Sequence, residues 1–362
     1  MTSDELGQAI CAHIVENGPI TFEEYVQHAL YTPGLGFYAR GGGAGRRRDF
    51  ITSPEVGPLF GALIARALDS WWVEMGSPAH FHLIEAGAGP GTLARALLAA
   101  GPRCGRAMEV MLVEPGEVQW ATHPAGVTSR AALPAPGELH GAPVVVLANE
   151  LLDNLPFGVV EFTGVGWSEV LVGVDPATGA LTEELRPLDP QRSKWCGDRA
   201  GAHIGEGARM PVMSHASAWL SEAMDLVVAG RAGRVLAIDY GSTSEAMAHR
   251  STSEWLRTYA GHDRGLNPLD SPGAYDITCD IALDQLALVH PPSADRSQAE
   301  FLHAHGIDDL VMEGRARWDA DRWSGGLEAL AGLSREAEAA ALTDLTGLGA
   351  FRALEWIVPD PA

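Results

Sequence analysis

Residues 83–92 read LIEAGAGPGT, and this stretch decides the fold. A short apolar strand is followed by glycines at positions 87, 89 and 91, and then by a helix that begins at Thr92. Glycine lacks a Cβ atom, so it lets a ligand approach the backbone and adopts the positive φ angles of tight turns. Sheets of this kind bind ligands outside the carboxyl ends of their strands. We therefore expect Gly87, Gly89, Gly91 and Thr92 to bind a cofactor.

The regions on both sides of this loop alternate between short apolar runs and helical segments. Runs such as VVVLA have no polar face, which is typical of strands that are buried on both sides. Strands that alternate with helices favour a parallel sheet with helices on both faces. We predict an α/β fold with a Rossmann-like sheet. Its strands are expected at 81–86, 108–114, 142–150, 234–241 and 351–358.

Two cofactors compete for the glycine loop. A dinucleotide fingerprint reads G-x-G-x-x-G and places backbone amides against a pyrophosphate. This chain reads G-x-G-x-G and has Thr92 where the third glycine of that fingerprint would fall, which favours S-adenosylmethionine over NAD. Glu85 would pair with the ammonium group of that cofactor or fix the loop. Glu114 ends the next strand and can accept hydrogen bonds from both ribose hydroxyls, a role that both cofactors allow. A tight turn without a ligand is the remaining interpretation.

A polar cluster follows the apolar run that precedes Asn149. Asn149, Glu150 and Asp153 would face the cofactor crevice, where a methyl acceptor would lie. Glu150 and Asp153 can clamp a guanidinium through paired hydrogen bonds and handle the proton of the attacking nitrogen. Alternatively, Asn149 and Asp153 cap the turn that follows. We expect these three residues to be catalytic.

Two regions lie outside the regular strand and helix alternation. Residues 1–75 are expected to form a helical N-terminal region with a glycine-rich loop, and Thr21 with Glu24 resembles a capping box that opens a helix. Residues 76–362 would form the cofactor-binding domain. It carries insertions at about 157–212, which reads as a hairpin extension, and at about 250–330. The first insertion would form a homodimer interface or a substrate cover.

Composition limits the classes of partner. The net charge of −22 disfavours nucleic acid, which needs clustered Lys and Arg, and is compatible with a cationic substrate. The chain has no run of 18 apolar residues, so we expect no membrane span. Its four cysteines are far apart, and its first residues resemble neither a signal nor a transit peptide, so we expect a cytoplasmic location. The pairs His80/His82 and His303/His305 lack nearby further ligands, so we expect no metal site.

Seven blocks of sequence together resemble the MidA/NDUFAF7-like family of class I methyltransferases. The likeness extends over most of the chain and includes several blocks outside the glycine loop. These blocks are DFITSPEVGPLFG (49–61), LIEAGAGPGTL (83–93), LVEPGEVQ (112–119), LANELLDNLPF (147–157), AIDYG (237–241), WLRTYAGHDRGLNPLDSPGAYDIT (255–278) and SQAEFLHAHGI (297–307).

The resemblance implies an S-adenosylmethionine-binding core and, from the mitochondrial member, a protein arginine methyltransferase that assists respiratory complex assembly. It also assigns roles to residues outside the glycine loop. By this resemblance Thr52, Ser53, Pro54 and Glu55 would lie near the cofactor, whereas Asp239, Tyr240 and His262 would line the far side of the acceptor site.

The sequence departs from the family pattern at two positions. Pro90 stands where the family loop carries Arg, and Asn154 stands where Ala is common. These departures put the acceptor in doubt rather than the cofactor. The leading hypothesis is methyl transfer to an arginine nitrogen of a protein or peptide. The alternatives are a small-molecule O- or N-methyltransferase, a non-catalytic assembly factor that binds the cofactor, and an NAD oxidoreductase.

Overall fold

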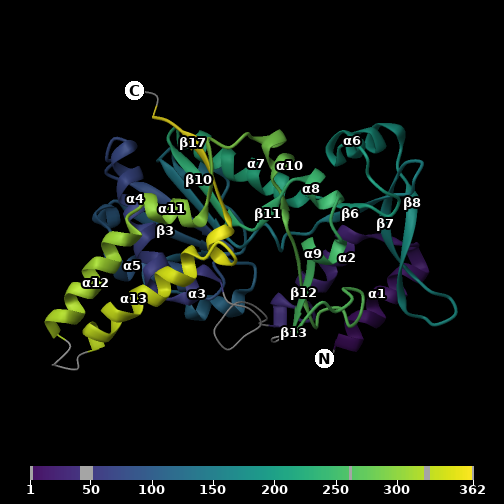
Figure 1. Cartoon of the computed structure of the whole chain (residues 1–362), viewed down its shortest axis with the longest axis horizontal. Coiled ribbons are helices and arrows are strands. Elements are labelled where there is room, and N and C mark those ends of the chain that lie inside the picture. Colours follow the sequence, from purple (N-terminus) through teal and green to yellow (C-terminus); the bar gives the residue numbers. More distant parts are fainter. Residues whose placement is uncertain (1–2, 41–51, 261–262, 322–326, 361–362) are drawn as a thin grey trace.

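A seven-stranded sheet forms the centre of the computed structural model, which describes residues 3–40, 52–260, 263–321 and 327–360 (Figure 1). Its order is β16-β17-β10-β5-β2-β3-β4. The strands from β10 to β4 run parallel, and β17 is antiparallel to both β10 and β16. The strands are β2 (Phe81–Ala86), β3 (Met108–Val113), β4 (Thr128–Arg130), β5 (Val144–Asn149), β10 (Gly233–Asp239), β16 (Ala294–Ser297) and β17 (Arg352–Val358).

Helices cover both faces of this sheet. Val144 and Val146 of β5 pack into one buried cluster, whereas Val145 and Leu147 pack into another, because successive side chains of a strand point to opposite faces. The first face is covered mainly by α7 (Ser214–Ala229), and the second by α4 (Pro58–Glu74) and α5 (Thr92–Ala100). Burial on both sides explains why residues 144–148 of the central strand β5, VVVLA, include no polar residue.

The order in which the chain adds strands to the sheet reverses between β2 and β5. It runs from β2 outward through β3 to β4, and then returns to place β5 on the other side of β2. The loops that leave β2 and β5 therefore separate from each other and open a crevice at the carboxyl ends of these strands. This topology places the glycine loop next to the polar residues that follow Asn149.

A second sheet lies beside the first, and Figure 1 shows it together with α6 (Pro190–Ala200). β6 (Gly158–Phe162) and β7 (Trp167–Val174) form the hairpin that the sequence predicted for this segment. β8 (Leu181–Pro187) and β9 (Arg209–Val212) extend it. The fifth strand, β1 (Ile20–Thr21), comes from the N-terminal region and pairs with β7.

The N-terminal region contributes α1 (Ser3–Asn17) and α2 (Phe22–Tyr31). The predicted capping box is present: the Glu24 amide donates to Thr21 Oγ1 over 3.1 Å, and the Thr21 amide donates to Glu24 Oε2 over 2.8 Å. These bonds satisfy amides that have no partner within the first turn of a helix. They fix the start of α2, whose last residue, Tyr31, reaches the crevice.

The remaining elements lie around the rim of the central sheet. β12 (Leu256–Ala260), β13 (Asp263–Arg264) and β14 (Asp276–Cys279) form a small antiparallel sheet. The helices α12 (Ile307–Asp321) and α13 (Leu327–Thr343) pack together, and Glu338 of α13 accepts a hydrogen bond from the Leu59 amide at the start of α4. The short elements are α3 (Ser53–Val56), α8 (Ser244–Ala248), α9 (Thr252–Trp255), α10 (Leu283–Val289), α11 (Gln298–Ala304), β11 (Gly241–Ser242) and β15 (Ile281–Ala282), with 3₁₀ turns at Tyr38–Arg40, Arg103–Arg106, Glu117–Thr122, Pro136–Leu139 and Leu348–Ala350.

No helix in the described part of the chain has both the length and the apolar character needed to cross a membrane.

Candidate functional site

A cavity of about 600 Å³ lies at the carboxyl ends of β2, β3 and β5. This volume is within the range of pockets that bind cofactor-sized ligands. Its walls come from the three loops that follow these strands, from the end of α2 and from the segment around α3. The predicted site residues on its wall are Thr52, Pro54, Glu55, Glu85, Gly87, Gly89, Thr92, Glu114, Asn149 and Glu150.

The glycine loop has the backbone conformation that the sequence predicted. Gly87, Gly89 and Gly91 have φ angles of +67°, +51° and +75°, which side-chain-bearing residues rarely adopt. A Cβ atom on Gly87 would lie 2.9 Å from Leu151 Cδ1, too close for normal packing. A residue other than glycine would therefore disturb both the loop and the Leu151 side chain on the cavity wall.

Two buried carboxylates flank the glycine loop. Glu114 accepts hydrogen bonds from the Gly89 amide over 3.0 Å and from the Gly116 amide over 2.7 Å, so it joins the loops after β2 and β3. Burial raises the pKa of Glu114, although these two bonds oppose the shift. Burial also raises the pKa of Glu85 to about 8, against a hydrogen bond from the Ala94 amide. A cation that entered the cavity would stabilise the charged form of both groups.

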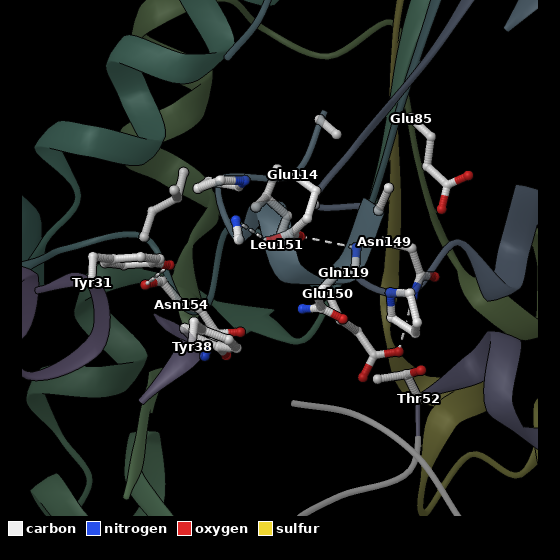
Figure 2. A pocket seen from close by; sticks show the side chains of 18 of the residues that line it. Tyr31, Tyr38, Thr52, Glu85, Glu114, Gln119, Asn149, Glu150, Leu151 and Asn154 are labelled. Atoms are coloured by element: carbon white, nitrogen blue, oxygen red, sulfur yellow. Dashed lines mark hydrogen bonds between the residues drawn. The ribbon is translucent and has the colours of Figure 1, made fainter. Parts of the chain in front are cut away.

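Glu150 follows β5 and extends its carboxylate toward Thr52, as Figure 2 shows. Its φ angle is +51°, and its Oε1 accepts hydrogen bonds of 3.0 Å from the Ser53 amide and from Asn149 Nδ2. Desolvation raises the pKa of Glu150 to about 8, and the nearby charge of Asp153 adds to this shift. Asn149 Oδ1 is buried and has no hydrogen-bond partner among the described residues. A donor from a bound ligand would satisfy this oxygen.

Thr52, Pro54 and Glu55, which the sequence analysis placed near the cofactor, line the cavity. Glu55 Oε1 accepts a 2.7 Å hydrogen bond from Thr92 Oγ1 and so ties α3 to the start of α5. Ser53 lies behind the wall, where its hydroxyl donates to Gln298 over 2.8 Å. Ser53 therefore orients Glu150 through its backbone amide, and its side chain does not face the cavity.

Three predicted residues lie behind the cavity wall rather than on it. Asp239 is buried, and its Oδ2 accepts hydrogen bonds from the amides of Leu152 and Asp153. Asp153 is buried and accepts a hydrogen bond from the Tyr240 hydroxyl. The predicted acceptor contacts of Asp153, Asp239 and Tyr240 are therefore corrected, because these groups bond to one another and to the loop after β5. His262 lies outside the described residues.

Sequence reasoning missed an aromatic wall opposite Glu150. Tyr31 and Tyr38 stack with their ring centroids 5.5 Å apart, and Figure 2 shows them with Asn154 across the cavity from Thr52. The Tyr31 hydroxyl donates to the Asn154 carbonyl oxygen, and the Tyr38 hydroxyl donates to Asp276 Oδ1. The only signal was the pair of tyrosines that flank the Pro-Gly turn at residues 33–34, in a region interpreted as a helical preface.

Comparison with known proteins bears on this site. A family model described as "Putative S-adenosyl-L-methionine-dependent methyltransferase" matches residues 63–295, the stretch that contains the glycine loop, Glu114 and Glu150. The chain belongs to this family. Its cofactor is S-adenosylmethionine, and the fold, family and cofactor predicted from the sequence are confirmed.

Solved structures and curated relatives agree with this assignment. A crystal structure of a Burkholderia thailandensis protein bound to S-adenosyl-homocysteine matches 99% of this methyltransferase and 93% of that chain, with a TM-score of 0.82 and 26% identity. The mouse protein arginine methyltransferase NDUFAF7, mitochondrial, is 30% identical over 75% of this chain and 66% of its own length. The Drosophila melanogaster homologue is 28% identical over 76% of this chain and 68% of its own length.

These relatives correct one prediction. The curated proteins from mouse, fly and human are all named as mitochondrial, so the predicted cytoplasmic location is wrong.

The cavity of the methyltransferase fits its cofactor. The glycine loop offers a backbone surface without Cβ atoms where the methionine part would lie, beside the Glu85 carboxylate. Glu114 lies on the wall at the end of β3, where it would bind the ribose hydroxyls. The unpartnered oxygen of Asn149 is an acceptor that a polar ligand would satisfy. These cofactor contacts are our assignments from the geometry.

Proposed function

We propose that this methyltransferase transfers a methyl group to a guanidinium nitrogen of an arginine in a protein or peptide. The observation that carries the proposal is the Glu150 carboxylate on the wall of the same cavity as the glycine loop, held by the Ser53 amide and the Asn149 side chain. The names of the mouse and fly relatives, which are protein arginine methyltransferases, support it.

The chemistry assigns one task to Glu150. When bound, S-adenosylmethionine supplies an electrophilic methyl group on a sulfonium. A guanidinium that gains a methyl group on nitrogen must lose one proton from that nitrogen, and Glu150 is the group that accepts it. A carboxylate with a pKa of about 8 is a stronger base than an ordinary glutamate, and about a tenth of it is ionised at pH 7. Its charge also orients the guanidinium before reaction.

The aromatic wall suits a cationic acceptor. Tyr31 and Tyr38 line the cavity on the side opposite Glu150, and a flat guanidinium stacks well on aromatic rings. The hydroxyl groups of both tyrosines are occupied by hydrogen bonds to Asn154 and Asp276, so the rings are held in place. An arginine side chain would thus meet an aromatic surface and a carboxylate in one cavity.

The test compares Glu150→Gln with the wild type and with Glu222→Gln, a matched change at an exposed glutamate on α7. Each protein is incubated with S-adenosylmethionine and a set of arginine peptides, and methylated products are measured by mass spectrometry. We expect Glu150→Gln to lower turnover by about 10²- to 10⁴-fold, the usual contribution of a general base. Binding of S-adenosyl-homocysteine, measured by calorimetry, should be retained.

The same set includes each peptide with lysine in place of arginine, together with small amines and phenols. Methylation of the small molecules or of lysine alone would contradict an arginine acceptor. Equal turnover by Glu150→Gln and the wild type would remove Glu150 from the chemistry. Cofactor binding without methylation of any substrate would favour the non-catalytic assembly factor.

A further inference from the structure

A cluster of three polar side chains lies at the end of the sheet opposite to the cavity. His80 immediately precedes β2, His82 is its second residue, and Glu109 is the second residue of β3. His82 and Glu109 are direct partners in the parallel register of the two strands. Alternation along a strand places residues two apart on the same face, so His80 and His82 lie on the same side as Glu109.

The distances in this cluster approach those of a metal-binding site. Glu109 Oε2 lies 3.5 Å from His80 Nε2 and 3.8 Å from His82 Nδ1, and the ligand atoms of the three residues all lie within 4.8 Å of one another. Ligand atoms about 2.0–2.2 Å from a tetrahedral zinc ion lie roughly 3.3–3.6 Å apart. His80 and Glu109 are about half exposed, so their side chains can make the remaining adjustment.

His82 provides an independent observation. Its residue is only 6% exposed, and its Nδ1 is buried without a hydrogen-bond partner among the described residues. A buried ring nitrogen without a partner is costly.

We propose that His80, His82 and Glu109 bind a zinc ion. Two imidazoles and one carboxylate are a common zinc ligand set, with water in the fourth position. The sequence analysis expected no metal site here because no further ligand lies close to the two histidines in the chain. The pairing of β2 with β3 brings the Glu109 carboxylate beside them. Since β2 separates this cluster from the glycine loop, the ion does not reach the cofactor. It stabilises the amino ends of β2 and β3.

The test uses protein without a polyhistidine tag, titrated with zinc chloride by calorimetry after dialysis against a chelator. We expect one zinc ion per chain and a higher Tm with zinc than without it, because an ion that binds only the folded state stabilises it. Cobalt added in place of zinc should give the visible absorption of a tetrahedral site. His82→Ala should weaken zinc binding by at least about 100-fold. A residue that only holds a metal ligand in place typically costs about 10- to 100-fold when it is changed, so a larger loss indicates a direct ligand.

Two further variants keep the outcome clear. Glu109→Gln changes a half-exposed residue, so it tests the site even if His82→Ala fails to fold, and it should also weaken zinc binding. His303→Ala removes an exposed histidine of the other H-x-H pair and should bind zinc as the wild type does. No saturable binding by the wild type, or equal binding by Glu109→Gln, would overturn the proposal. Binding of S-adenosyl-homocysteine should be the same in all of them, so this result does not depend on the proposed function.

Discussion

The loops that follow β2 and β5 lie on the same cavity but are built in different ways. The loop after β2 presents backbone: its three glycines have positive φ angles, and the space in front of Gly87 would be filled by a Cβ atom. The loop after β5 presents side chains: Asn149 and Glu150 lie on the wall, and Glu150 itself has a positive φ angle. The first loop provides a surface for a ligand, and the second provides chemical groups.

The unusual backbone of Glu150 has a local cause. Its amide donates a 2.8 Å hydrogen bond to the Ile238 carbonyl of β10. The amides of Leu152 and Asp153 donate hydrogen bonds to Asp239 Oδ2. The chain therefore turns sharply at Glu150 while its side chain points toward Thr52. A strained conformation is often found where function requires one side chain in one direction. The comparison teaches that the loop after β2 exposes its backbone because its glycines lack Cβ atoms. The loop after β5 instead fixes the direction in which the Glu150 side chain points.

The largest expected effect tests the chemical role of the second loop. Because the pKa of Glu150 is raised to about 8, its carboxyl group is mostly protonated below that pH and cannot accept a proton. The ionised fraction rises from about 1% at pH 6 to about half at pH 8, so kcat/KM for the arginine peptide should rise about 50-fold over this range. A rate that is flat or falls with rising pH would contradict the assignment, and Glu150→Gln should lose this dependence.

A smaller effect tests the first loop. Gly87→Ala should weaken S-adenosyl-homocysteine binding by at least about tenfold, because the new Cβ meets Leu151 on the cavity wall. Gly101→Ala is the matched control: Gly101 has the same φ of +67° but nothing within 4 Å of a Cβ atom. It should lose about 1 kcal/mol or more of stability from backbone strain and still bind the ligand normally. Equal binding by both variants, measured by calorimetry, would show that the surface of this loop is not used.

The smallest effect tests the residues behind the second loop. Asp153→Asn removes a negative charge that raises the pKa of Glu150, so the midpoint of the pH profile should move to lower pH. The plateau of kcat should change by less than about threefold, because Asp153 does not line the cavity. A loss of kcat as large as that of Glu150→Gln would mean that Asp153 contacts the acceptor after all. The pH profile distinguishes these two results.

Much of the central fold could be predicted because its signals are local. The apolar runs became β2, β3, β5 and β10, and the glycines at 87, 89 and 91 required the turn that the structure contains. The capping box of Thr21 and Glu24 is also a short-range pattern, since both bonds join residues three apart. Such features depend on neighbours in the chain and so are visible in the sequence.

The acceptor side of the site could be predicted only in part. Glu150 was predicted from its place after a strand, but the directions of Asp153, Asp239 and Tyr240 depend on hydrogen bonds between the loop after β5 and the residues at the end of β10. The aromatic wall arises because α2 packs against the loop after β5, which brings Tyr31 to Asn154 from 123 residues away. Pairing of β2 with β3 likewise brings Glu109 to the two histidines. Such contacts leave no periodic pattern in the chain.

The pairing of β1 with β7 has a consequence for how the chain folds while it is being synthesised. Ile20 and Val172 are direct partners although they are more than 150 residues apart, so β1 has no partner strand until the chain has been made as far as β7. The last strand, β17, then inserts between β10 and β16, in the interior of the sheet rather than at its edge. Contacts between such distant segments form slowly. The nascent chain must therefore keep its exposed strand edges from associating with other molecules until β17 has been made.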